Sequence, residues 1–127
     1  MTATEFDAQR FREALGHYPT GVAVITGVGE DGEPAGMVVG SFTSVSLEPP
    51  LVGFLPMKSS GSFARMRTGT RFAVNVLGAD QEELCNLFAS RAPDKFAGVD
   101  WRPSPCGAPL LPDVVAWIEC EYADIVD

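Results

Sequence analysis

The chain has 127 residues, which predicts a single domain, residues 1–127, that can bury a core without disulfides or metals. Its formal net charge of −8 argues against nucleic acid and anionic membranes as general partners, because both select basic surfaces. No apolar run reaches the roughly 18 residues of a membrane span, and the N-terminus lacks the basic start and apolar stretch of a signal peptide, so we expect a cytoplasmic protein.

The first part of the chain predicts a helix followed by extended structure. Thr4 can cap a helix whose apolar residues, from Phe11 to Tyr18, recur at helical spacing. The β-branched run 21–28 predicts a strand, and the glycine-rich residues 29–36 predict a turn. Residues 37–47 predict a long second strand, so that the two strands form a hairpin.

The rest of the chain alternates strands with short helices. Residues 51–55 predict a buried strand, 62–66 a short helix and 71–77 another strand. Asp80 and Glu83 predict an acidic capping box for the next helix. Five prolines in 91–113 predict an irregular connection, and the alternation in 114–126 predicts a last strand with one buried face. Strands therefore dominate, which indicates a mainly β fold with short helices, in the form of a β-barrel with appended helices.

Several residue patterns that could indicate a catalytic or binding site are better explained by a structural role. Gly27, Gly29 and Gly32 match the dinucleotide-binding pattern, but Pro34 follows and no helix opens there, so they predict a hairpin turn. His17 is the only histidine, which excludes a histidine-rich metal site. The three cysteines lack ligand spacing and predict free, buried or half-buried thiols. We therefore expect no metal site and no catalytic side chain.

An acid-free segment, residues 49–79, contains the sequence PMKSSGSFARMR. The ammonium of Lys58 and the hydroxyls of Ser59, Ser60 and Ser62 are donors of the kind that hold a terminal phosphate. The alternative is that the serines only cap a short helix while the arginines face solvent. The residues alone leave both interpretations open.

The segment GMVVGSFTSVS combines extended structure with small residues. Gly36, Gly40, Ser41, Ser44 and Ser46 leave the main chain approachable, as a flat ligand bound by main-chain N–H and C=O groups requires. The alternative is a plain strand with a bulge at Gly40.

Five blocks occur in the order seen in a known family: FREALGHYPTGVAVIT, GMVVGSFTSVSLEPPLVGFLPMKSS, RFAVNVL, LFASRAPDKFAGVDW and GAPLL. Together they resemble the flavin reductase-like family of FMN-binding split barrels, the short-chain reductase components of two-component flavin monooxygenases. The resemblance implies a homodimeric split β-barrel that binds FMN or FAD near the subunit interface. It also implies an NAD(P)H-dependent flavin reductase that passes hydride to flavin N5 and supplies reduced flavin to a separate monooxygenase.

The same resemblance implies which residues contact the flavin. Those expected at the isoalloxazine ring are Val38, Val39, Gly40, Ser41 and Ser44, and those expected at the ribityl phosphate are Lys58, Ser59, Ser60, Ser62 and Phe63. Lys95 and Phe96 match a further pair on the cofactor side. Arg65, Arg67 and Arg71 are expected to supply background potential or to face solvent.

The chain departs from the family in two respects. Val38, Val39 and Gly40 stand where many relatives have Thr-Ala-Asn or a similar triplet, which shifts ring contacts toward the main chain. The chain also ends at Asp127, before a Gly-Asp-His segment and further strands of the family, so we expect it to be truncated at its C-terminus. The alternative function is a non-catalytic flavin-binding or dimerisation module.

Overall fold

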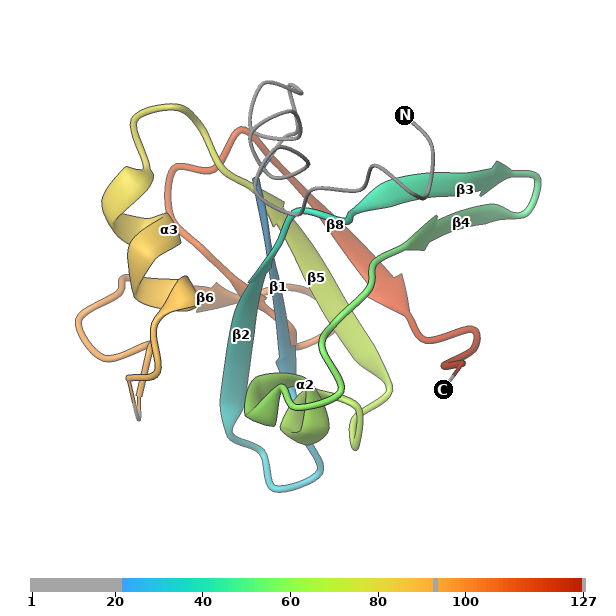
Figure 1. Ribbon diagram of the computed structural model, residues 1–127, viewed down its shortest axis with the longest axis horizontal. Coiled ribbons are helices and arrows are strands. Elements are labelled where there is room, and N and C mark those ends of the chain that lie inside the picture. The colour runs from blue at the N-terminus through green and yellow to red at the C-terminus, as the bar shows by residue number, and fades with distance from the viewer. Residues whose placement is uncertain (1–21, 93, 127) are drawn as a thin grey trace, which may run out of the picture.

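The computed structural model describes residues 22–92 and 94–126 (Figure 1). The helix expected from Thr4, and His17 with it, lie outside the described residues. The elements in chain order are β1 (Ala23–Val28), β2 (Pro34–Val39), β3 (Thr43–Leu47), β4 (Pro50–Gly53), α2 (Gly61–Met66), β5 (Arg71–Val76), α3 (Glu82–Ala89), β6 (Arg102–Pro103), β7 (Pro109–Leu110) and β8 (Ala116–Glu121). The expectation of a mainly β fold with short helices is confirmed.

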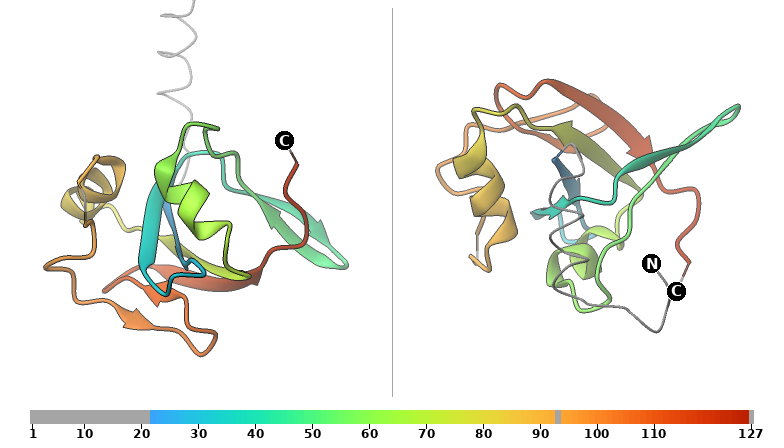
Figure 2. Two further views of the ribbon diagram at one scale, coloured as in Figure 1. Left: turned by 90° about the horizontal axis from the view of Figure 1, so that it is seen from below. Right: turned by 45° about the horizontal axis from the view of Figure 1, so that its top comes forward.

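The central element is a four-stranded antiparallel sheet with the strand order β2-β1-β5-β8. Successive side chains of a strand point to opposite faces, so β1 and β5 contribute to a core on each side. One core contains Ile25 and Val74 together with Met66 of α2. The other contains Val24 and Phe88, so α3 covers the opposite face of the sheet from α2 (Figures 1 and 2).

The turn between β1 and β2 has the hairpin conformation expected from its glycines. β1 pairs with β2 over their whole length, and the Gly32 N–H donates to the Gly29 carbonyl over 3.0 Å. Gly32 has a φ of 80°, which favours glycine. A Cβ at Gly29 would lie 2.5 Å from the Arg65 carbonyl oxygen, so this turn also sits directly against α2. The hairpin interpretation of the glycine pattern is confirmed.

The prediction of one long strand over residues 37–47 is wrong. β2 begins earlier, at Pro34, and ends at Val39, and β3 pairs with β4 in a separate two-stranded sheet that projects from the central one (Figures 1 and 2). The Ser41 hydroxyl accepts a 2.8 Å hydrogen bond from the Leu55 N–H, which directs the chain away from the central sheet. β4 is also only half-buried and ends at Gly53, so the buried strand expected over 51–55 is wrong in extent and burial.

The capping box expected at the start of α3 is also wrong. The N-cap residue is Gln81, and its side chain makes no capping hydrogen bond. Gln81 instead accepts a hydrogen bond from the Gly78 N–H and donates one to the Pro112 carbonyl, each over 2.9 Å. The side chain thus joins the turn before α3 to the segment before β8.

Residues 91–113 were expected to be irregular, but they contain the short β6–β7 pair and are fixed to the sheet. Asn75 is fully buried, and its amide donates to the Val24 carbonyl and the Thr26 hydroxyl and accepts from the Leu111 N–H. The Thr26 hydroxyl donates in turn to the Pro109 carbonyl. These hydrogen bonds hold the segment against β1 and β5, because an unpaired polar group buried there would be costly.

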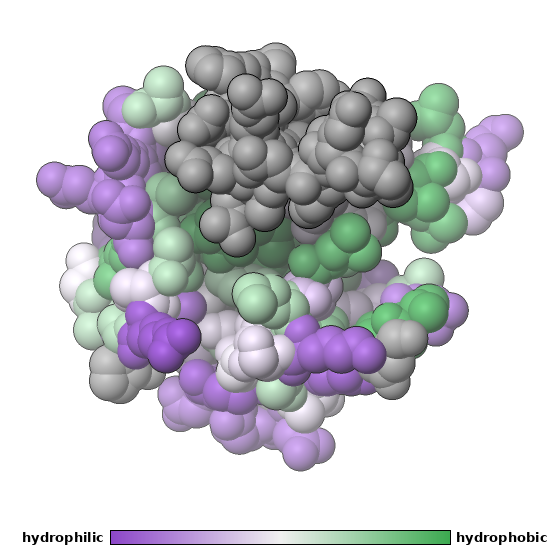
Figure 3. All heavy atoms as spheres, viewed as in Figure 1, coloured by the Kyte–Doolittle hydropathy of each residue, from purple (hydrophilic) through white to green (hydrophobic). Residues whose placement is uncertain are grey.

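The last strand does not have one continuous buried face. Cys120 and Tyr122 pack against the core that contains Ile25, as expected for their side of the strand. Ile118, on the same side, is 41% exposed, and Val115 and Trp117 are 71% and 46% exposed. The expectation is wrong there because nothing among the described residues covers this part of β8. Apolar residues are also exposed over the β3–β4 hairpin, where Leu47 is 86% exposed (Figure 3).

Candidate functional site

The outer edge of β2 pairs with no other strand among the described residues. The Lys95 ammonium donates to the Gly36 carbonyl over 3.1 Å, which shows that the main-chain groups of Gly36 point toward this edge. In an antiparallel strand the N–H and C=O of one residue point the same way, and alternate residues share that direction. Val38 therefore presents its N–H and C=O at the same edge, where a planar ligand can be hydrogen-bonded by the main chain.

Gly40, two residues after Val38, lies just beyond the end of β2. It is exposed, and a Cβ built on it would have no atom of the described residues within 4 Å. No part of residues 22–92 and 94–126 therefore fills the space beside the end of β2. Val39, between them, is buried in the core with its side chain directed inward, so it can contribute only main-chain atoms to a ligand.

Lys95 joins three elements at this edge. Besides Gly36 of β2, its ammonium donates to the Ser62 hydroxyl of α2 over 3.3 Å and to the Phe88 carbonyl of α3 over 2.9 Å. An ammonium has three N–H donors, so these three acceptors use them all. Burial lowers the pKa of Lys95 from its ordinary value. Lys95 thus fixes the positions of both helices relative to β2.

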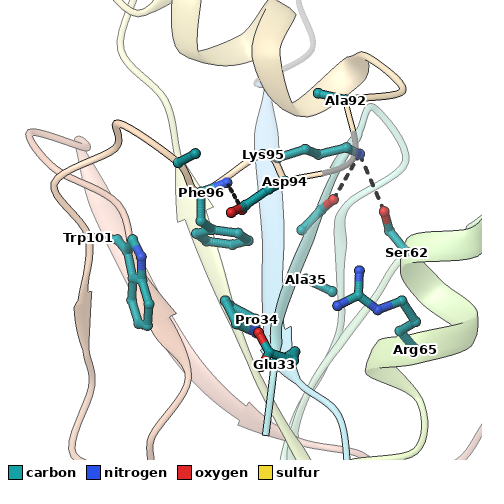
Figure 4. Close-up of a pocket in the computed structure, with 12 residues that line it drawn as sticks. Glu33, Pro34, Ala35, Ser62, Arg65, Ala92, Asp94, Lys95, Phe96 and Trp101 are labelled. Carbon is teal, nitrogen blue, oxygen red and sulfur yellow. Dashed lines mark hydrogen bonds between the residues drawn. The ribbon is translucent and has the colours of Figure 1, made fainter. Parts of the chain in front are cut away.

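A pocket of about 440 Å³ lies along the β2 edge, between α2 and the segment 92–101 (Figure 4). Arg65, Lys95 and Ser62 lie on one side of it, and Phe96 and Trp101 on the other. The two aromatic rings pack edge to face with their centroids 5.6 Å apart. The remaining lining residues are Glu33, Pro34, Ala35, Gly36, Ala92, Asp94 and Ala97.

The serine-rich segment before α2 serves partly as a helix start. The Ser60 hydroxyl accepts a 3.1 Å hydrogen bond from the Phe63 N–H and is the N-cap of α2. The helix-cap interpretation is therefore confirmed for Ser60. Lys58 and Ser59 lie in the preceding turn and are exposed, so their side chains are accessible to a ligand.

A larger cavity of about 990 Å³ lies on the other side of α2. It is bounded by the β3–β4 hairpin, the segment 54–60, β8 and residues 122–126. Two of its lining atoms, Tyr122 Oη and Glu119 Oε1, are buried without a hydrogen-bond partner in the described part of the chain. Burial raises the pKa of Tyr122 to about 12, while the nearby Arg67 acts in the opposite direction. This cavity is called the hairpin groove below.

The structure distributes the expected site residues around α2 instead of placing them in one cavity. Ser62, Lys95 and Phe96 line the pocket beside β2, and Val38 packs against the core that contains Phe96. Four others line the hairpin groove: Ser44, Lys58, Ser60 and Phe63. Val39, Gly40, Ser41 and Ser59 line neither cavity, and the Ser41 hydroxyl is engaged with Leu55.

Two lining residues of the pocket were missed as site residues. Arg65 was expected to supply background potential or face solvent, although it lines the pocket. Trp101 stands at the end of the block LFASRAPDKFAGVDW, five residues after Phe96, but nothing in its spacing indicated a ligand. The signal for both is the proximity of α2 to the segment 92–101, which only the fold provides.

Other kinds of site find no support within residues 22–92 and 94–126. No group of three His, Cys, Asp or Glu side chains is placed to hold a metal ion there. No helix in this part of the chain is both long enough and apolar enough to cross a bilayer. The three cysteines are free and half-buried, as expected.

A comparison with protein families identifies the chain. The sequence model of the flavin reductase like domain matches residues 15–127. The chain belongs to this family. The resemblance inferred from the sequence blocks is therefore confirmed.

Individual relatives agree with this family. The chain is 51% identical to a flavin reductase of Pseudomonas putida, over 98% of this chain and 74% of that protein. It is 46% identical to the reductase subunit HsaB of a flavin-dependent monooxygenase of Rhodococcus jostii, over 100% of this chain and 65% of that protein.

A solved structure gives the same fold. The NADH:FAD oxidoreductase of Streptomyces globisporus, in complex with NAD and FAD fragments, matches with a TM-score of 0.85 and 41% identity, over 95% of this chain and 73% of that one. The chain thus spans between 65% and 74% of the length of these three proteins.

Proposed function

We propose that this protein is an NAD(P)H-dependent flavin reductase that transfers hydride from a nicotinamide to FMN or FAD and supplies reduced flavin to a separate monooxygenase. We further propose that residues 1–127 act as one flavin reductase-like domain, in a cytoplasmic homodimer. The names of the relatives support the reaction and the oxygenase partner, because they include flavin reductases and the reductase subunit of a monooxygenase.

The observation that carries the proposal is the outer edge of β2, which pairs with no described strand and lies beside the three hydrogen bonds of Lys95. Val38 directs its N–H and C=O to this edge, and no described residue fills the space next to Gly40. A flavin ring carries hydrogen-bonding groups along one rim, and main-chain groups of an unpaired strand can bind it without any particular side chain. The Val-Val-Gly triplet therefore suits the flavin as well as a polar triplet would.

The ribityl phosphate then lies near the start of α2. Ser59 and Lys58 are exposed there, and the Ser62 hydroxyl faces the Lys95 ammonium. Charge-assisted hydrogen bonds to a phosphate contribute about 1.5–3 kcal/mol each, so two or three such donors anchor the flavin. Ser60 is not among them in this proposal, because its hydroxyl already caps the helix.

The described residues suit a reaction in which the protein supplies no proton donor or acceptor. A bound flavin would accept hydride at N5 from the nicotinamide, which would be oxidised, and solvent would supply the one proton that completes the reduced flavin. The protein's own part is to hold the ring on the β2 edge and to fix α2 and α3 around it through Lys95.

The surface of β8 supports the homodimer. Ile118 is exposed and lines the apolar hairpin groove, and Val115 and Trp117, on the other side of the strand, are exposed as well. Large exposed apolar side chains of this kind are frequent at subunit interfaces.

The central experiment mixes the purified protein with NADH or NADPH and with riboflavin, FMN or FAD, and follows nicotinamide absorbance. We expect oxidation of the nicotinamide that depends on added flavin. Absence of oxidation with every flavin and both nicotinamides would refute the proposed reaction.

A second experiment tests the phosphate anchor. Lys58→Gln combined with Ser59→Ala is expected to weaken FMN binding about tenfold or more, while riboflavin, which lacks the phosphate, binds as before. Arg71→Gln, which removes an exposed cation outside both cavities, is the matched control. Equal losses for FMN and riboflavin would mean that these residues do not hold the phosphate.

A further inference from the structure

We propose that the outer edge of β8 pairs with the same edge of a second copy of the chain, so that two four-stranded sheets join into one. The pairing is antiparallel and two-fold symmetric, with Ile118 opposite Ile118 of the second copy at the axis. This inference rests on the homodimer of the proposed function and names its interface, but it does not depend on the flavin chemistry.

The main-chain groups at this edge are available for pairing. The Tyr122 N–H donates to the Thr70 carbonyl over 3.1 Å, in line with the pairing of β8 and β5. Because alternate residues of a strand share a direction, the even-numbered residues of β8 face β5. β8 is the last strand of the central sheet, and no other described strand pairs with it (Figure 1). The residues whose N–H and C=O point outward are therefore Trp117, Glu119 and Glu121.

The side chains along this edge are large, apolar and accessible. Trp117 is 46% exposed, and Ile118, on the opposite face of the strand, is 41% exposed. An apolar edge strand without a neighbour is a template for another strand, and proteins normally cover it. A second β8 would cover both faces of this edge at once.

Charge selects the register of the pairing. With Glu119 at the axis, the two copies of this carboxylate would face each other, and with Cys120 at the axis each Glu119 would face a Glu121. Like charges directly opposite each other destabilise a strand pair. With Ile118 at the axis, Glu119 faces Trp117 of the second copy, and no acidic residue faces another.

A register with Trp117 at the axis would pair fewer main-chain groups. It would place Glu119 opposite Val115, but the Val115 N–H already donates to the Val76 carbonyl over 2.9 Å. With Ile118 at the axis, both Trp117 and Glu119 have an outward-facing residue opposite them. Each of these pairs can exchange both of its main-chain hydrogen bonds.

The same register supplies a partner for a polar atom that lacks one. Glu119 Oε1 is buried without a hydrogen-bond partner in the described part of the chain. Side chains directly opposite each other in an antiparallel pair have Cβ atoms about 5 Å apart. The indole N–H of Trp117, which can only donate, then lies beside the carboxylate of the second copy's Glu119. The pairing thus removes part of the cost of that buried acceptor.

The first test measures the mass of the protein in solution by sedimentation equilibrium. We expect twice the 13.5 kDa of one chain at about 50 µM, a concentration suited to a small interface. Ile118→Lys places two ammonium groups side by side at the axis and should raise the dimer Kd at least about tenfold. Leu47→Lys, at a position on β3 that is 86% exposed, is the matched control and should leave that Kd within about twofold.

The second test fixes the register by disulfide formation with oxidised glutathione, in a chain whose three cysteines are replaced by serine. Ile118→Cys should give a linked dimer, because Cα atoms opposite each other at this kind of position are about 4.5 Å apart, within the range for disulfides. Glu119→Cys should link much less, since it faces Trp117. Preferential linking through Glu119→Cys would overturn the proposed register. Thermal melting checks that each variant is folded.

The third test concerns the contact between the indole and the carboxylate. Trp117→Phe and Glu119→Ala should each raise the dimer Kd about tenfold or more, the loss of a hydrogen bond to a charged group. The double variant should be little weaker than either single one, because both changes remove the same bond. Effects that simply multiply would overturn this contact.

The outcomes separate the interface from the other proposals. A monomer at about 50 µM would refute both the β8 pairing and the homodimer. A dimer that persists in Ile118→Lys and does not link through Ile118→Cys would overturn the pairing and leave the homodimer intact. NADH oxidation is measured on the same samples: a dimer with the expected links but no flavin-dependent oxidation would support the pairing and refute the proposed reaction.

Discussion

Gly36 of β2 packs against Phe88 of α3, and we predict that Gly36→Ala destabilises the protein. A Cβ at this position would lie 2.7 and 2.8 Å from two ring carbons of Phe88 and 3.3 Å from Phe96. Real Cβ atoms do not approach other heavy atoms so closely, so something must shift. Phe88 is only 1% exposed and is surrounded by core residues, so its ring cannot turn toward solvent.

The expected magnitude follows from two opposing effects. Overpacking a core by one methyl group costs about 1–3 kcal/mol. Replacing glycine with alanine in a strand returns about 0.5–1 kcal/mol, because the unfolded chain loses conformational freedom. The net loss is therefore about 1–2 kcal/mol, or about 5 °C in Tm for a domain of this size.

The assay is thermal or urea denaturation of Gly36→Ala beside a matched variant. Gly40→Ala is the control, because a Cβ at Gly40 meets no atom of residues 22–92 and 94–126 within 4 Å, and its Tm should stay within about 1 °C of the original protein. In the Gly36→Ala background, Phe88→Leu should cost less than it does alone, with a coupling of about 1 kcal/mol. A Gly36→Ala protein that melts like Gly40→Ala would refute the reasoning.

Three further predictions concern buried polar groups. Asn75→Leu, similar in size, should cost about 3 kcal/mol in urea denaturation, because it leaves the buried Leu111 N–H without its acceptor and removes the amide's hydrogen bonds to the Val24 carbonyl and the Thr26 hydroxyl; a loss below about 1 kcal/mol would contradict this. Lys95→Met should lower the free energy of unfolding by about 2 kcal/mol and weaken the binding of both FMN and FAD, because it removes the hydrogen bonds that tie α2 and α3 to β2. Lys95→Arg should restore part of the stability in denaturation and part of the affinity in flavin titrations. Tyr122→Phe removes a buried hydroxyl that has no hydrogen-bond partner among the described residues, and it should leave stability equal or raise it by up to about 1 kcal/mol at neutral pH. Because the pKa of Tyr122 is raised from 10.0 to about 12 on folding, the original protein should lose this residue's contribution as pH rises from about 10 to 12, and Tyr122→Phe should flatten that decline in melts taken across this range.

The features that the sequence predicted well are those determined by neighbouring residues. The β1–β2 turn depends on Gly29 and Gly32, and the start of α2 depends on Ser60 and Phe63, three residues apart. The sequence also identified β1, β5 and β8 as strands. Local composition is sufficient for such elements, because their hydrogen bonds or their apolar pattern lie within a few residues.

The features that it predicted badly depend on contacts between distant segments. The break between β2 and β3 accompanies the hydrogen bond between Ser41 and Leu55, and the start of α3 accompanies that between Gln81 and Pro112, 31 residues away. No periodicity reveals such pairs, so both elements were assigned wrong boundaries.

The candidate site divides in the same way. Lys95 meets Ser62 across 33 residues and Gly36 across 59, and only the family resemblance suggested that Lys95 belonged with the others. Arg65 was visible in the basic segment, but the side of α2 that it occupies follows from how Met66 enters the core.

The hydrogen bonds of Asn75 have a consequence for the motion of the pocket wall. Leu111 is tied through Asn75 to the central sheet, and it packs in the same core as Phe96 and Trp101. The proline-rich segment can therefore open only when the sheet itself opens, and amide hydrogen exchange at Leu111 should be as slow as that of β1 and β5. A wall that shares the sheet's resistance to opening is already ordered before a ligand arrives, so binding there loses little conformational entropy.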